Sequence, residues 1–164
     1  MRLTHFFTFL IAIHISICCS KYPKEIPKGF SFEIIDDIDS YNSINGSFTR
    51  KAINDKFLDT IVVYTLSQKD KEEIYKVLIE NDVLSIPKYF ECASNAQFMI
   101  PSFNTTLKVQ INGIKQEIKF DTSCFPKKDA GAANRFDNIV KYIRAKLHSQ
   151  KIIQKLPKTK MRLM

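Results

Sequence analysis

Hydrophobic and polar residues alternate with a period of two in the part of the chain that begins near residue 30. Phe30, Phe32 and Ile34 are separated by polar residues, which predicts a strand with one buried face. The acidic run 36–40, Asp-Asp-Ile-Asp-Ser, interrupts this pattern. A second strand is predicted over 47–53, where the alternation resumes.

The strongest strand signal is the run 60–65, Thr-Ile-Val-Val-Tyr-Thr. It is β-branched, aromatic and apolar on both faces, which predicts a central place in the sheet. A helix is predicted to begin directly after it, because Ser67 is followed three residues later by Asp70, as at a capped N-terminus. Pro87 ends this pattern. The apolar stripe of the helix is Ile74, Val77 and Leu78.

The second half of the domain contains a loop, a hairpin and a long helix. Residues 87–103 have many aromatic side chains without a clear period, which indicates a structured loop. Around Asn112-Gly113, a pair typical of a type I′ turn, two alternating segments predict a β-hairpin. Helical spacing then extends from residue 130 to about 156, and Pro157 ends it. The apolar positions of this helix are Phe136, Ile139, Val140, Ile143 and Leu147.

The order β-β-β-α-β-β-α predicts an α+β fold for one domain over residues 29–157. We expect an antiparallel sheet of about five strands with two helices packed on one face. The chain continues beyond this domain as a basic tail, residues 158–164.

The N-terminus has the pattern of an export signal over residues 1–18. Arg2 supplies the positive charge, and the apolar run 6–17 is too short for a permanent membrane span. A cysteine at the end of such a run is the position that a bacterial lipoprotein peptidase requires, so Cys19 is the predicted lipidation site. The alternative is cleavage after Ser20, which would remove both Cys18 and Cys19.

Residues 19–28 are then the anchor cysteine and a polar, Pro-containing tether. The predicted location is the cell envelope, with the domain membrane-anchored and facing the periplasm or the exterior; the alternative is secretion. Two sequons begin at Asn45 and Asn104. They would accept glycans in a eukaryotic secreted protein, in which case Cys19 would be removed instead of acylated.

Cys92 and Cys124 are the two cysteines left in the domain, and in an oxidising compartment such a pair favours a disulfide. The closed loop of 33 residues corresponds to roughly 3–4 kcal/mol in the chain-entropy model. The alternatives are two free thiols or half of a metal site. No second Cys or His lies close to either residue in the sequence, which weakens the metal alternative.

The chain has 25 basic and 17 acidic residues and a formal net charge of +8. Residues 141–164 contain eight basic residues and no acidic one. Lys141, Arg144, Lys151 and Lys155 are spaced so that one helix would present them on a single flank. The alternative is a solvated helix face with a disordered tail. Contact with an anionic surface is predicted for four lysines: Lys151, Lys155, Lys158 and Lys160.

Catalytic and cofactor motifs are not found, so no catalytic residue, metal or cofactor is predicted. His5 and His14 leave with the signal, and His148 remains, between basic residues that disfavour its imidazolium; we expect a solvated histidine. Nucleic-acid binding is not expected, since no recognition motif is present. Two carboxylate sets remain as alternatives. They are a calcium site at Asp36, Asp37 and Asp39, against a simple turn, and a glycosidase-like pair, Glu33 and Glu117.

Four features define the layout: a cysteine-terminated signal, an acidic helix over 66–75, an Asn-Gly hairpin whose second strand reads QEIKFD at 116–121, and a last helix ending Lys155-Leu-Pro. This layout resembles uncharacterised small lipoproteins of Gram-negative bacteria. The resemblance implies an envelope location and transfers no activity.

Three functions follow as hypotheses. The first is a non-enzymatic, membrane-anchored envelope lipoprotein whose domain binds an envelope protein, an anionic lipid or a polysaccharide. The second is a secreted inhibitor or immunity-type protein that blocks an enzyme with the loop 87–103. The third is a carboxylate-based hydrolase.

Overall fold

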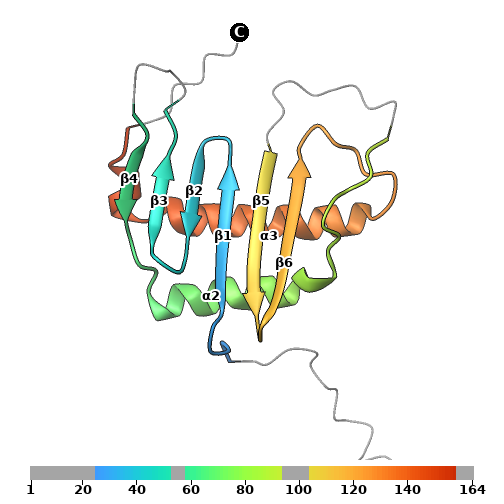
Figure 1. The fold of residues 1–164 in the computed structure, drawn as a ribbon, viewed down its shortest axis with the longest axis horizontal. Coiled ribbons are helices and arrows are strands. Elements are labelled where there is room, and N and C mark those ends of the chain that lie inside the picture. Colours follow the sequence, from blue (N-terminus) through green and yellow to red (C-terminus); the bar gives the residue numbers. More distant parts are fainter. Residues whose placement is uncertain (1–24, 53–57, 94–103, 158–164) are drawn as a thin grey trace, which may run out of the picture.

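The computed structural model describes residues 25–52, 58–93 and 104–157. The strands in these ranges are β1 (Ser31–Asp36), β2 (Asp39–Asn42), β3 (Ser47–Arg50), β4 (Thr60–Val63), β5 (Asn104–Ile111) and β6 (Ile114–Asp121). The helices are α2 (Gln68–Glu80), the 3₁₀ helix η2 (Val83–Ser85), α3 (Ala130–His148) and α4 (Lys151–Gln154). Figure 1 shows α2 and α3 on the same side of the sheet.

The described strands form one antiparallel sheet in the order β4-β3-β2-β1-β5-β6. The first four strands are consecutive neighbours, and β5 then pairs with the free side of β1, with Phe32 opposite Val109. The predicted α+β class is confirmed, with six strands instead of about five. β1 and β2, and not a later strand, are therefore the centre of the sheet.

The core lies between the sheet and the two long helices. Alternate residues of β1 and β5 point into it, as do the apolar stripes predicted for the helices. No helix of the described residues covers the opposite face of the sheet (Figure 1). The largest fully buried side chains include Tyr41, Phe48, Ile74, Leu78, Leu107, Ile118, Phe136, Ile139 and Ile143.

The expected central strand is in fact the edge strand β4, so that prediction is wrong. Val62 points towards the core, but Ile61 and Val63 are 63% and 69% exposed on the uncovered face. An apolar run on both faces normally indicates burial on both sides. Here the two outward-facing residues, Ile61 and Val63, have no described helix packed over them.

The acidic run 36–40 is a turn that leads into β2, a strand that the sequence pattern did not reveal. The Asp36 carboxylate accepts hydrogen bonds from the backbone N–H groups of Ile38 and Asp39, at 2.8 and 2.6 Å. Such a side-chain bond stabilises a tight turn locally. The chain therefore reverses at residues 37 and 38, and β1 and β2 pair as neighbours.

The start of α2 agrees with its predicted cap, because the Ser67 hydroxyl accepts the N–H of Asp70 at 3.1 Å. The predicted single helix over 130–156 is wrong, since it divides into α3 and α4. Ser149 donates its N–H to Ala145 and its hydroxyl to the Lys146 carbonyl, and Gln150 is extended (ψ 127°). These bonds cap α3 at His148 and turn the chain before α4.

The Asn112-Gly113 hairpin between β5 and β6 is confirmed, with both turn residues at positive φ (50° and 78°). The second predicted strand, 47–53, corresponds to β3, which ends at Arg50; residue 53 lies outside the described residues. Of the predicted loop 87–103, the structure describes 87–93 only.

Candidate functional site

Asp39 is the centre of an ionic cluster that joins the sheet to the end of α3. It begins β2, directly opposite Arg50 at the end of β3. The Arg50 guanidinium donates to both carboxylate oxygens, at 2.9 and 3.0 Å, and His148 Nε2 lies 2.9 Å from Oδ2. Because Asp39 is only 8% exposed, these two partners replace the water that the carboxylate lost.

The electrostatics of this cluster favour the ionised carboxylate. Burial by itself would raise the pKa of Asp39, but the hydrogen bonds from His148 and Arg50 outweigh it, so the pKa lies below its ordinary value. His148 is half-exposed and has a carboxylate partner. The expected exposure to solvent is thus present, but the sequence did not indicate the carboxylate partner.

A cleft of about 490 Å³ opens beside the cluster, lined by its three residues and by Ile38, Ile153, Gln154 and Leu156. A histidine held by an aspartate resembles the base of a nucleophilic catalyst, which needs a hydroxyl or thiol within hydrogen-bond reach. None of the residues that line this cleft carries one. In addition, Arg50 Nη1 lies 3.4 Å from the carbonyl oxygen of Pro157. The cluster thus ties β2, β3, α3 and the segment after α4 together.

The three aspartates of the acidic run have different partners instead of one shared ion. Asp36 pairs with Arg144 on α3, at 2.9 Å from Nε. Asp37 accepts the N–H of Asn104, at 2.8 Å. Among the described residues, no group of three or more His, Cys, Asp or Glu side chains is arranged to hold a metal ion. The arrangement is that of a turn whose carboxylates are used by neighbouring donors.

Three cations of α3, Lys141, Arg144 and Lys146, pair with nearby acids. Lys141 pairs with Asp137 one turn away, at 2.6 Å, and Arg144 with Asp36. Lys146 contacts Glu73 and Asp70 of α2, and its hydrogen bond to Glu73 is the main reason that its pKa is raised. The pairs of Lys146 and Arg144 hold α3 to α2 and to the sheet. Arg135, which donates to the Ser85 hydroxyl, has no acidic partner within the described residues.

The lysines of the C-terminal segment are different. Lys151 and Lys155, at the two ends of α4, are exposed, and neither has an ion pair within the described part of the chain. They do not continue the flank of Lys141 and Arg144, because the chain turns between α3 and α4. The other two lysines of the predicted surface, Lys158 and Lys160, lie outside the described residues.

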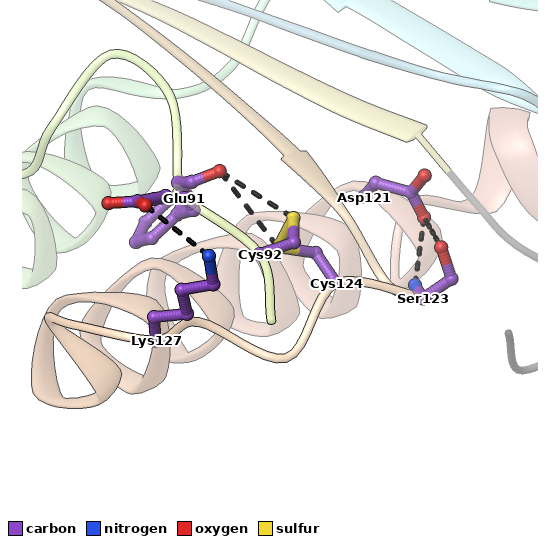
Figure 2. The surroundings of a disulfide bond; sticks show 7 residues. Glu91, Cys92, Asp121, Ser123, Cys124 and Lys127 are labelled. Carbon is purple, nitrogen blue, oxygen red and sulfur yellow. Dashed lines mark hydrogen bonds and ion pairs between the residues drawn. A yellow bond between two sulfur atoms is a disulfide. The ribbon is translucent and has the colours of Figure 1, made fainter. Parts of the chain in front are cut away.

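The Cys92–Cys124 disulfide is present, with a Cα–Cα distance of 5.1 Å (Figure 2). It excludes the free-thiol and metal alternatives for this pair in the oxidised protein. Next to it, Glu91 and Lys127 form an ion pair at 3.5 Å, and Ser123 donates to the Asp121 carboxylate. The disulfide connects residues 88–93, the segment after η2, to the turn after β6.

The disulfide-linked segment also covers the edge of the sheet beside β6. Tyr89 forms a parallel bridge with Lys119, whose N–H donates to the Lys88 carbonyl at 2.9 Å. Further along, Ala93 donates to the carbonyl of Phe125 at 2.8 Å. Sequence reasoning described 87–103 as a loop and missed that its first residues pair with a strand.

The glutamates considered for glycoside hydrolysis lie on the uncovered face, on either side of Lys108. Glu33 of β1 and Glu117 of β6 are both opposite Lys108 of β5, hence two strand spacings or about 10 Å apart along the sheet. Glu33 pairs with Lys108 at 2.8 Å and Glu117 with Lys119 at 3.1 Å. The hydrogen bond from Lys119 also lowers the pKa of Glu117. A general acid requires a raised pKa, so the environment of Glu117 does not favour that role.

Comparison with known proteins finds no matching family model and no matching curated sequence. Within the described residues, no helix is both long and apolar enough to cross a membrane.

Proposed function

We propose that this chain is an exported, membrane-anchored envelope lipoprotein whose α+β domain binds a macromolecular partner without catalysing a reaction. The observation that carries the proposal is the Cys92–Cys124 disulfide. Stable disulfides form in oxidising compartments and are rare in the cytosol. The bond therefore supports the export inferred from residues 1–18, and Cys19 is the residue that an anchor would use.

The basic C-terminal segment supports contact with an anionic membrane. Lys151 and Lys155 have no intramolecular ion pair among the described residues, so their charge is available to a partner. A Lys near an anionic surface contributes on the order of 1 kcal/mol. A fully extended tether of residues 19–28 would reach at most about 35 Å. That reach keeps the domain near the bilayer and allows α4 to approach it.

The anchor is tested by labelling cells with an alkyne analogue of palmitate. The wild-type chain and Cys18→Ala should carry the label, and Cys19→Ala should lose it. Cys18→Ala is the matched control, because it removes a neighbouring thiol and leaves the acceptor. Absence of label on the wild type, or label that persists in Cys19→Ala, contradicts the anchor.

The surface contact is tested with the chain from Ser20 onward, which keeps every described element. Its binding to vesicles of phosphatidylglycerol and phosphatidylcholine should weaken strongly when Lys151, Lys155, Lys158 and Lys160 become Gln. Added salt should have the same effect. The matched control is Lys141→Gln, since that charge already has an intramolecular partner. Equal binding by the wild type and the quadruple variant contradicts the contact.

A second candidate function, inhibition of an enzyme, is favoured by one observation. Two exposed aromatic side chains, Tyr89 and Phe125, flank the disulfide-linked segment, and rigid aromatic side chains are common anchors in interfaces. Purification of the chain from its native envelope distinguishes the two candidates. A stoichiometric hydrolase whose activity falls on binding supports inhibition, while a structural envelope protein supports the first proposal.

A further inference from the structure

The outer edge of β4 has the features of a strand that pairs with another strand. In the described sheet, β4 has a neighbour on one side only, β3. Its sequence, Thr-Ile-Val-Val, contains no charged residue, no proline and no glycine. Natural edge strands are usually protected by charges, prolines, bulges or a covering segment, because exposed backbone groups can pair with another chain. β4 is short, which limits its pairing surface, but it has no charge, proline or bulge within its four residues.

The hydrogen-bonding pattern shows which backbone groups face outward. Tyr64 donates its N–H to Gly46 at 2.7 Å, and residues 46 and 64 are opposite each other in the register of β3 and β4. Bonding pairs alternate along an antiparallel ladder, so Val62 also directs its backbone groups towards β3. The N–H and C=O groups of Ile61 and Val63 therefore point away from the sheet.

We propose that this edge binds β4 of a second copy of the same chain, in an antiparallel register centred on Val62. Ile61 of one copy then lies opposite Val63 of the other, and the reverse pair forms by two-fold symmetry. This register uses all four outward backbone groups on each copy, which gives four intermolecular hydrogen bonds. A register shifted by two residues would pair Ile61 or Val63 with itself and leave the other residue beyond the end of the partner's strand.

The side chains match this register too. Paired residues of an antiparallel ladder point to the same face. Two Ile61 and two Val63 side chains, exposed in the single chain, would form one β-branched cluster on the uncovered face. Cross-strand pairs of β-branched side chains stabilise an antiparallel ladder. Self-pairing is thus favoured over an unrelated segment, because β4 is complementary to itself in both backbone and side chains.

Charge also permits a contact between identical surfaces. A two-fold axis brings each charge near its own copy, so a charged patch would repel itself. On the uncovered face beside the edge, β2 and β3 present only neutral polar side chains: Ser40, Asn42, Ser47 and Thr49. The nearest charges are Lys51, directly after β3, and Asp59, directly before β4, which have opposite signs and bond within the chain to the Asp36 carbonyl and the Ala52 N–H. The paired lysines and glutamates of this face lie farther away, on β1, β5 and β6.

The expected dimer is weak and depends on concentration. A stable interface buries about 800 Å² on each partner, which four strand residues alone do not supply. An anchor that confines the chains to one membrane would raise their effective concentration and favour pairing. The self-pairing itself does not require the anchor, so it is measured on the chain from Ser20 onward.

Sedimentation equilibrium from low to high micromolar concentration tests the contact. The wild-type chain should show a monomer–dimer equilibrium, and Ile61→Lys/Val63→Lys should weaken it by about tenfold or more. Ile114→Lys is the matched control, because Ile114 is also an exposed apolar strand residue but belongs to β6. Ile61→Thr/Val63→Thr is a milder second variant. Retained near-wild-type circular dichroism confirms that each variant is folded.

A cysteine cross-link tests the register. Val62 would face its own copy in a non-hydrogen-bonded pair with Cα atoms about 4.5 Å apart, within disulfide range. Under copper-phenanthroline with dissolved oxygen as the oxidant, Val62→Cys should form a covalent dimer and Ile44→Cys, in the β2–β3 turn, should not. A monomeric wild type, dimers unaffected by the lysine pair, or cross-linking of Val62→Cys only to a different protein in cells overturns the proposal.

Discussion

At the β6 edge, residues 88 and 89 bond to the strand at Lys119. Residues 91–93 are held to the chain after β6 by backbone bonds and by the Cys92–Cys124 disulfide. At the β4 edge, Ile61 and Val63 are mostly exposed, and no described strand pairs with the outer side of β4. Both edges belong to one sheet, so they differ only in what lies beside them. The difference indicates that one edge is closed within the chain and that the other is available to another chain.

The two sides of the sheet are also tied to the rest of the domain by different chemistry. On the β6 side the tie is covalent. On the β2–β3 side it is the buried ionic cluster of Asp39, Arg50 and His148. A covalent tie responds to reductant and an ionic tie responds to pH, so the two can be broken separately.

The largest expected effect is loss of the covalent tie. Cys92→Ser/Cys124→Ser should lower the free energy of unfolding by roughly 3–4 kcal/mol, since the closed loop no longer limits the unfolded chain. Urea denaturation of the chain from Ser20 onward measures this. Reductant should destabilise the wild type by a similar amount and leave the double variant unchanged. A reductant effect of equal size on both proteins contradicts the assignment.

Removal of the ionic tie ranks second. Asp39→Asn leaves the Arg50 guanidinium poorly compensated in a site where both side chains are largely buried. We expect a loss of about 2–3 kcal/mol, below the range for fully buried pairs because His148 and part of Arg50 reach solvent. Asp137→Asn removes the exposed partner of Lys141 and should cost no more than about 0.5 kcal/mol. Urea denaturation at neutral pH compares the two variants.

The ionic tie should also weaken in acid. Because the pKa of folded Asp39 lies below its unfolded value, its contribution is present above the unfolded pKa, near 3.9, and is lost as pH falls through the folded pKa. Asp70 and Glu73 have lowered pKa values as well, so stability should fall in acid even without Asp39. The measurement is therefore a difference: Asp39→Asn should lose less stability than the wild type between pH 5 and 2. Parallel curves would show that Asp39 is not responsible.

A smaller effect is expected from residues 88–93, which include the residues that bond to β6. Tyr89 lies under the ammonium groups of Lys88 and Lys119, at 5.3 and 5.9 Å from the ring centroid. Tyr89→Ala should cost about 0.5–1 kcal/mol, as for exposed cation–π contacts. Hydrogen exchange should quicken at the Lys119 amide, which bonds to this segment, and remain slow at Leu107 in the centre. Uniform acceleration would indicate global destabilisation instead.

The smallest effect on folding is expected at the open edge. Ile61→Thr/Val63→Thr should change the stability of dilute protein by no more than about 0.5 kcal/mol, because both side chains are mostly exposed. The same substitutions at Phe32 and Ile34, on the covered face of β1, should prevent folding. A large loss at β4 would mean that something within the chain covers this edge.

Local patterns predicted the elements that depend on neighbouring residues. The Ser67 cap, the Asn112-Gly113 turn and the stripe of Phe136, Ile139 and Ile143 were all predicted, because each depends on residues a few positions apart. The disulfide was predicted from compartment and cysteine number. These features need no knowledge of which strands are neighbours.

The features that were not predicted depend on the order of strands in space. The run 60–65 has the composition of a central strand, and only the return of β5 to β1 makes it an edge. Asp39 and His148 bond to each other although they are more than 100 residues apart in the chain. No periodicity reports such a pair, so His148 was interpreted from its basic sequence neighbours alone.

The pairing of β1 with β5 has a consequence for how the chain acquires its structure. Ser31 is opposite Gln110, so the pairing of β1 with β5 closes a stretch of about eighty residues. Closure of so long a loop is entropically costly, and contacts of this range slow folding. While the chain emerges, the four-strand meander and α2 can form early, but β1 keeps an open side until β5 arrives. The cysteine in the turn after β6 emerges later still, so oxidation is expected to seal a sheet that is already assembled and not to guide its assembly.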